Sequence, residues 1–199
     1  MSEQAVAAIR SGKAVVLPTD TVYGLVTDAY REGPARLLYR LKSRPEAMPC
    51  ALLAAELDAI LEVVPELRGR AAVTARALLP GAYTLVLPNP ARRFRWLCGS
   101  APEAIGLRVP DLPAVSRAIL DRVAVVASTS ANLHGGQEAR RLDDVPDEIR
   151  REAGAVVDGG ELPGVPSTVV DLTAREPRIL REGAVPAAEV LERLRAVPV

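Results

Sequence analysis

Short apolar runs that end in proline or in small polar residues recur along this 199-residue chain. Such runs are typical of buried strands, whereas apolar residues spaced three or four apart predict amphipathic helices. We expect strands over residues 14–17, 51–53, 83–87, 106–109, around 125–126, 155–157 and 169–172. We expect helices starting at Ser2, at Gly33-Pro34 and at Pro186, and helices over residues 57–63, 66–79, 112–123 and 146–153.

Strands and helices alternate in this pattern, and no linker is long enough to divide the chain. Alternation of this kind is typical of α/β proteins in which helices cover a sheet. We therefore predict one α/β domain over residues 1–199, with a twisted mixed sheet, flanking helices and no internal repeat.

Two cations follow the second predicted helix, in the sequence Lys42-Ser43-Arg44-Pro45. Pro45 disfavours a helical conformation at Arg44, and in extended chain residues i and i+2 face one way, so we expect a two-cation clamp for an anionic ligand. Lys13 and Lys42 are the only lysines among 25 cationic side chains, which makes Lys42 mildly informative. The alternative is that both are ordinary cations at a helix C-terminus.

The overall composition excludes several classes of protein. The 25 basic and 25 acidic side chains cancel, so a general nucleic-acid coat is not indicated. Cys50 and Cys98 form no CxxC motif, and His134 is the only histidine, so zinc sites and Ser-His-Asp triads are unsupported. The first residues lack the pattern of a signal peptide and no long apolar run occurs, which predicts a cytoplasmic protein without membrane contact.

Phosphate-binding glycine motifs, GxxxxGK[ST] and GxGxxG, are also missing from the sequence. An enzyme of this composition would act mainly by positioning and charge stabilisation. That requirement suits phosphoryl or adenylyl transfer, in which cations and a nucleotide-bound metal hold the developing charge.

Seven blocks together resemble the YrdC-like threonylcarbamoyl-AMP synthases, in their short form. The blocks begin at Pro18-Thr19-Asp20-Thr21, Lys42-Ser43-Arg44-Pro45, Pro80-Gly81, Gly106-Leu107-Arg108, Ser130-Ala131-Asn132, Ser167-Thr168-Val169 and Ile179-Leu180-Arg181. The resemblance spans nearly the whole chain. It implies a YrdC-like sheet around an open cleft, and the conversion of L-threonine, bicarbonate and ATP into threonylcarbamoyl-AMP and pyrophosphate.

The resemblance also implies site residues, a metal and partners. Lys42, Arg44, Ser130 and Asn132 would be catalytic and bind ATP, together with Thr84 and Arg181; Thr19, Arg108, Ser128, Ser167 and Thr168 would bind threonine. Mg²⁺ would be carried by ATP, with no metal site of the protein's own. The product would supply the threonylcarbamoyl modification of tRNA adenosine 37, with contact to tRNA and to downstream threonylcarbamoyl-transfer proteins.

The residues leave some alternatives open. Arg108 and the hydroxyls suit an amino acid chemically, because a guanidinium can bind a carboxylate through two hydrogen bonds. Thr19 and Ser167 could instead be turn or strand-end residues. Met48 and Leu112 depart from the family pattern, which leaves room for a paralogue with an altered substrate. A non-catalytic RNA-binding module and a carbamoyl-adenylating maturation domain are the other functions that we consider.

Overall fold

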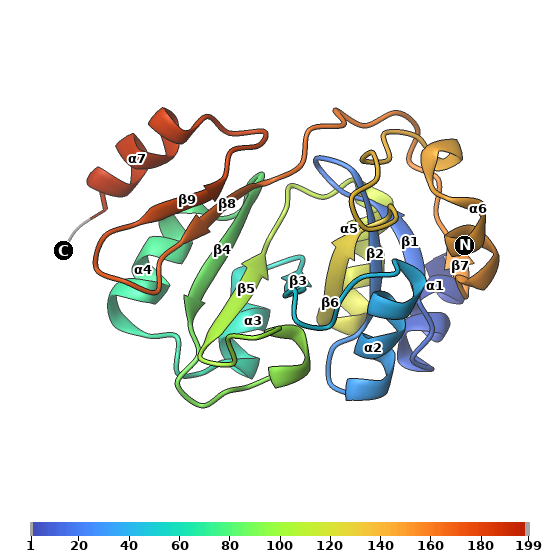
Figure 1. The fold of residues 1–199 in the computed structure, drawn as a ribbon, viewed down its shortest axis with the longest axis horizontal. Helices are drawn as coiled ribbons and strands as arrows, with labels where there is room; N and C mark the ends of the chain where they lie inside the picture. Colours follow the sequence, from blue (N-terminus) through green and yellow to red (C-terminus); the bar gives the residue numbers. More distant parts are fainter. Residues whose placement is uncertain (1, 198–199) are drawn as a thin grey trace.

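The computed structural model describes residues 2–197, in which nine strands form one mixed sheet. The strands are β1 (Val15–Pro18), β2 (Tyr23–Asp28), β3 (Ala51–Ala54), β4 (Tyr83–Pro88), β5 (Ala104–Arg108), β6 (Val125–Ser130), β7 (Ala155–Val156), β8 (Thr168–Asp171) and β9 (Arg178–Arg181). Their order across the sheet is β7-β1-β2-β6-β3-β5-β4-β8-β9 (Figure 1). The predicted α/β architecture with a mixed sheet is confirmed.

Helices flank the sheet on both faces (Figure 1). They are α1 (Ser2–Arg10), α2 (Glu32–Leu41), α3 (Leu57–Val63), α4 (Gly69–Leu78), α5 (Ala114–Val123), α6 (Asp147–Glu152) and α7 (Ala187–Arg195), with 3₁₀ turns η1 (Arg95–Leu97) and η2 (Leu142–Asp144). None of the helices within residues 2–197 has the length and apolar character needed to cross a membrane.

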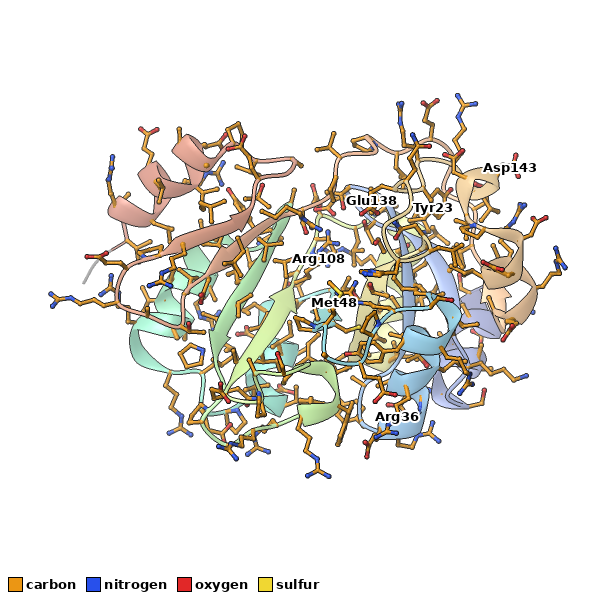
Figure 2. The ribbon with its side chains drawn as sticks, in the orientation of Figure 1. Tyr23, Arg36, Met48, Arg108, Glu138 and Asp143 are labelled. Atoms are coloured by element: carbon orange, nitrogen blue, oxygen red, sulfur yellow. The ribbon has the colours of Figure 1, made fainter. Side chains whose placement is uncertain are left out.

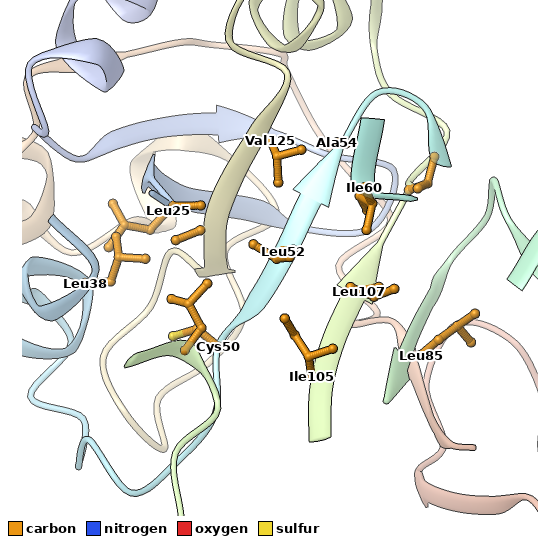
Figure 3. Close-up of a cluster of buried hydrophobic side chains, with 14 of the residues drawn as sticks. Leu25, Leu38, Cys50, Leu52, Ala54, Ile60, Leu85, Ile105, Leu107 and Val125 are labelled. Carbon is orange, nitrogen blue, oxygen red and sulfur yellow. The ribbon is translucent and has the colours of Figure 1, made fainter. Parts of the chain in front are cut away.

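The core lies on both faces of the sheet because successive side chains of a strand point to opposite sides. Val15 and Leu17 join one buried cluster, which includes Val6 of α1 and Ile119 of α5. Val16 lies between them in sequence and joins the other. That second cluster, part of which is shown in Figure 3, contains Leu25, Leu38, Leu52, Ile60, Leu85 and Leu107.

The β4 strand alternates in the same way, but one of its faces is not fully buried. Tyr83, Leu85 and Leu87 are buried, while Thr84 and Val86 are partly exposed. Val86 pairs with Gly106 of β5. The partly exposed positions of β4 and β5 therefore share one face, and this face forms the floor of the cavity described below.

Two strands were missed by the sequence interpretation. Tyr23 lies outside every strand that we expected, but it begins β2, which pairs antiparallel with β1 from Pro18↔Tyr23 onward. The pair Ile179-Leu180 belongs to the edge strand β9, which pairs with β8. Their apolar runs are short or contain glycine, so the alternation of apolar and polar residues that marks a strand is weak in them.

Other boundaries also moved. The α4 helix begins at Gly69 and not at residue 66, and α5 begins at Ala114 and not at residue 112. Residues 90–100, which we expected to be a loop, include the turn η1 and bury Leu97 and Cys98. Cys50 and Cys98 are both buried free thiols.

Candidate active site

A cavity of about 540 Å³ opens on the face shared by β4, β5, β6 and β8. Alternate residues of these strands line it, such as Thr84 and Val86 of β4 and Ser128 and Ser130 of β6. This spacing follows from the two-residue repeat of a strand. Seven of the predicted site residues lie in the lining, namely Arg44, Thr84, Arg108, Ser128, Ser130, Ser167 and Arg181.

Arg108 stands at the end of β5, where the parallel pairing places it beside Leu53 of β3. Its side chain is 11% exposed and its Nη2 donates to Asp20 Oδ1 at 2.9 Å and to Thr21 Oγ1 at 3.1 Å. Its Nε is buried without a partner. Burial lowers the pKa of Arg108, and the charge of Asp20 opposes this effect.

From the sequence, Arg108 was expected to hold the carboxylate of the amino acid through two hydrogen bonds. In the structure its Nη2 group already donates to Asp20 and Thr21. The Nη1 and Nε groups remain for a ligand. Asp20 also fixes the guanidinium in place, which prepares Arg108 for binding an anion.

Lys42 is 1% exposed and holds the turn that follows β6. Its Nζ donates to Ser130 O at 2.5 Å, to Asn132 O at 2.5 Å and to Asn132 Oδ1 at 2.8 Å. These three bonds use all the donors of an ammonium group. Burial, followed by the charge of Arg44, lowers the pKa of Lys42 to about 8.

The predicted two-cation clamp is therefore wrong in its geometry. Lys42 has helical angles, with φ −92° and ψ −2°, and Ser43 has φ 49°, so the segment is not extended. The two side chains separate: Lys42 lies beneath the Ser130–Asn132 turn, while Arg44 lines the cavity. Arg44 Nη2 donates to Pro49 O at 2.8 Å, and its Nε is buried without a partner.

Asn132 closes the turn from within. Its Oδ1 accepts the hydroxyl of Ser130 at 2.6 Å, and its Nδ2 donates to Gly136 O at 2.7 Å. Asn132 is buried and lies outside the cavity lining, whereas Ser130 is part of it. The structure thus places Lys42 and Asn132 behind the wall that Ser130 presents to the cavity.

Ser167 organises the opposite wall. Its hydroxyl lies 2.8 Å from Thr84 Oγ1, and its carbonyl accepts Arg181 Nη2 at 2.8 Å. Thr84 and Ser167 come together because β4 and β8 are parallel neighbours. Three side chains predicted from separate sequence blocks therefore meet on one side of the cavity.

Thr168 and Thr19 lie outside the lining and use their hydroxyls within the fold. Thr168 Oγ1 donates to Val185 O at 2.6 Å and accepts the N–H groups of Gly183 and Val185. Thr19 Oγ1 donates to Val22 O at 2.6 Å and stabilises the β1–β2 turn. This geometry corrects the expectation that both hydroxyls face threonine, and it favours structural roles for Thr19 and Thr168.

The sequence interpretation did not select Glu138, which lines the cavity from the loop before η2. Figure 2 shows Glu138 and Arg108 in the region between the two ends of the sheet, with Met48 below them. Met48 and Leu112, the two departures from the family pattern, are absent from the lining. Leu112 packs in the cluster of α1 and α5. No sequence motif marks Glu138.

Within residues 2–197, no group of three or more His, Cys, Asp or Glu side chains is arranged to hold a metal ion. The cavity lining includes three arginines and several hydroxyl groups beside the carboxylates of Glu103, Glu138 and Asp171. The arginine and hydroxyl groups suit an anionic ligand that supplies its own metal.

Comparison with known proteins gives one consistent family. The Sua5/YciO/YrdC model, described as "Telomere recombination", matches residues 7–183. A Mycobacterium leprae relative is 36% identical over 195 residues, which cover 98% of this chain and 88% of the relative. A Pyrococcus abyssi protein named threonylcarbamoyl-AMP synthase is 32% identical, covering 92% of this chain and 54% of the relative.

Solved structures agree with these relatives. P. abyssi Sua5 complexed with L-threonine matches with a TM-score of 0.87 and 30% identity, covering 98% of this chain and 57% of that protein. E. coli YciO matches with a TM-score of 0.82 and 27% identity, covering 93% of this chain and 90% of that protein. The chain thus spans little more than half of the P. abyssi protein and most of YciO.

Proposed function

Since the chain belongs to the Sua5/YciO/YrdC family, we propose that it is a threonylcarbamoyl-AMP synthase, a nucleotidyltransferase that joins L-threonine, bicarbonate and ATP. The products would be L-threonylcarbamoyladenylate and pyrophosphate. Relatives with this name and a relative structure complexed with L-threonine support the assignment.

The main support for the proposal is that polar residues from separate strands line opposite sides of one cavity. Ser128 and Ser130 contribute hydroxyls from β6. Thr84 of β4, Ser167 just before β8 and Arg181 of β9 contribute polar groups from the other side. The volume of about 540 Å³ is within the range of small-molecule sites. Residues from distant blocks of the sequence thus line a single pocket with anion-binding chemistry.

The residues divide the proposed reaction between them. Arg44, Arg181 and Ser130 would bind the ATP phosphates and stabilise charge as pyrophosphate leaves. Arg108 would bind the carboxylate of threonine, and Ser128 and Ser167 would face the rest of the amino acid. The carbamate oxygen then attacks the α-phosphorus, and the bond from that phosphorus to the pyrophosphate oxygen breaks.

Lys42 and Asn132 would support the reaction from behind the wall. Their hydrogen bonds fix the turn that carries Ser130, so they would hold that hydroxyl in the geometry required at the phosphates. This role replaces the direct phosphate contact that the sequence suggested for Lys42.

Mg²⁺ would enter bound to ATP, where it would offset the charge of the phosphates. Two arginines of the lining fit this arrangement, because Arg44 and Arg181 can bind phosphate oxygens that the metal leaves free. We expect EDTA to stop turnover.

We propose that the protein acts in the cytoplasm, without membrane contact. Downstream threonylcarbamoyl-transfer proteins would transfer the product to tRNA adenosine 37. Direct contact between this protein and tRNA can be tested by a gel-shift measurement.

The test is pyrophosphate release from ATP by the purified protein, with mass spectrometry of the nucleotide product. Release should require L-threonine and bicarbonate together. Serine lacks one methyl group and should be about 10- to 200-fold poorer, whereas valine lacks the hydroxyl and should be poorer by on the order of 10⁴. Release that ignores threonine would refute the proposal, and equal use of valine and serine would refute its threonine specificity.

The other functions considered from the sequence receive less support. A protein named HypF shares the fold at a TM-score of 0.75 but only 14% identity, so this likeness shows the fold alone and does not support a maturation domain. A non-catalytic RNA-binding module would bind RNA without ATP. A gel-shift measurement with and without ATP separates that activity from the proposed one.

A further inference from the structure

Glu138 lines the cavity from the loop between β6 and η2, and the proposed reaction assigns it no role. Its Oε2 atom is buried and makes no hydrogen bond to any residue that the structure describes. Leaving a buried carboxylate oxygen unpaired is unfavourable, since the oxygen loses its hydrogen bonds to water and gains none in the protein. Such a cost is common where a protein keeps a group ready for a ligand.

Two cations lie close enough to Glu138 to interact with it. The charge of Glu138 acts to raise the pKa of both Lys42 and Arg108. Neither cation donates a hydrogen bond to it, because Lys42 Nζ serves Ser130 and Asn132 and Arg108 Nη2 serves Asp20 and Thr21. Glu138 therefore stands beside Arg108 without being neutralised by it.

Other carboxylates near the cavity differ from Glu138 in this respect. Asp20 accepts from Arg108 through Oδ1 and from the N–H of Asp111 through Oδ2. Asp171 Oδ1 accepts from the N–H and the hydroxyl of Thr173. Glu103 is exposed. Glu138 is the carboxylate with a buried oxygen still available to a ligand in the described part of the chain.

An unpaired carboxylate selects a hydrogen-bond donor, preferably a cation, and repels phosphate and bicarbonate. Among the three proposed substrates, only the amino acid carries a cationic group. The α-ammonium and α-carboxylate groups share one carbon atom, so their partners must lie side by side. Arg108 and Glu138 provide opposite charges in the lining of one cavity, and Figure 2 shows them in the same region.

We propose that Glu138 binds the α-ammonium group of the amino acid and accepts a proton from it when the carbamate forms. This inference rests on the proposed function. The ammonium nitrogen has no free electron pair until it loses a proton. The N–C bond to bicarbonate then forms and a C–OH bond breaks; the leaving hydroxyl takes one ammonium proton to become water, and the second proton moves to Glu138.

The binding test compares two ligands and three proteins by isothermal titration calorimetry. L-threonine and 3-hydroxybutanoate share the carboxylate and the hydroxyl, but only threonine has the ammonium group. Glu138→Gln should weaken threonine binding by about 10- to 100-fold, the usual effect of removing one member of a buried charge pair. It should leave 3-hydroxybutanoate binding unchanged or stronger. Glu148→Gln, an exposed glutamate of α6, is the matched control and should change neither.

The kinetic test separates binding from proton acceptance. At saturating threonine, Glu138→Gln should still have a lower kcat for pyrophosphate release, and Glu138→Ala should behave similarly. If Glu138→Gln raises the KM for threonine and leaves kcat unchanged, Glu138 binds the ammonium group but does not accept its proton. Equal loss for both ligands, or weaker binding of Mg²⁺-ATP alone, would overturn the whole inference. If wild-type protein shows no threonine-dependent release, the proposed function itself fails.

Discussion

The two walls of the cavity handle their polar groups in opposite ways. The first, which we call the lysine wall, consists of Ser130, which lines the cavity, and of Lys42 and Asn132 behind it; Lys42 is 1% exposed and uses every Nζ donor inside the protein. The second, the serine wall, consists of Thr84, Ser167 and Arg181. The cation of the serine wall, Arg181, is exposed and lines the cavity. Its Nη2 group donates to the carbonyl oxygen of Ser167.

The difference separates two uses of a positive charge. A buried cation with three internal acceptors builds the local structure, and it cannot be removed without leaving those acceptors unpaired. An exposed cation at the mouth of a cavity contributes little to folding and can turn toward a ligand. A substitution in the lysine wall should therefore lower both the free energy of unfolding and the activity. A substitution in the serine wall should lower the activity alone.

The largest effect should come from Lys42→Met in the lysine wall. Activity should fall by roughly 10² or more, because Ser130 loses its fixed position. The free energy of unfolding should also fall by about 2 kcal/mol or more, since three oxygens lose their donor. Urea unfolding and pyrophosphate release measure the two quantities. Lys13→Met, at the other and exposed lysine, is the control. Unchanged stability would contradict the comparison.

Arg181→Met in the serine wall should lower activity by roughly 10², as expected for one positioned charge at a phosphate site. Its free energy of unfolding should change by less than about 1 kcal/mol because the side chain is exposed. Arg178→Met changes an exposed arginine of the same strand outside the cavity lining, and it should affect neither quantity. A strongly destabilised Arg181→Met protein would show that both walls are structural.

The pH dependence of stability should also distinguish the lysine wall. Burial lowers the pKa of Lys42 to about 8, below its value in the unfolded chain. As pH rises above about 8, the native state loses this proton before the unfolded state does, so the contribution of Lys42 to stability increases. The difference in unfolding free energy between wild type and Lys42→Met should grow by roughly 1–2 kcal/mol between about pH 8 and 9.5. If the difference in unfolding free energy between the two proteins does not change with pH, the pKa of Lys42 is not lowered.

The smallest effect is expected outside both walls, at Arg93. This arginine pairs with Glu66 through two hydrogen bonds of 2.7 Å, and both side chains are largely at the surface. Arg93→Gln should therefore change the unfolding free energy little and leave pyrophosphate release unchanged. Glu66→Gln should match it. A loss of tRNA binding in Arg93→Gln would instead identify this loop as a nucleic-acid contact.

Much of the site could be predicted because strand periodicity and short motifs are local. Ser128 and Ser130 share a face for the same reason that Thr84 and Val86 do, and this repeat is readable along the chain. Arg108 was selected through the family resemblance of its sequence block. Glu138 could not be found in this way, since it lies in a loop without a periodic pattern and matters only through the groups that surround it.

The sequence by itself determined the alternation of strands and helices, the α/β class and seven of the residues that line the cavity. The tertiary structure alone decided which cations face a ligand. Lys42 and Arg44 are two residues apart, yet a helical Lys42 and the positive φ of Ser43 send one beneath a turn and the other into the cavity. Chemical type is written in the sequence, but hydrogen-bond partners such as Asp20 for Arg108 and Asn132 for Lys42 come from segments about 90 residues away, which only folding brings together.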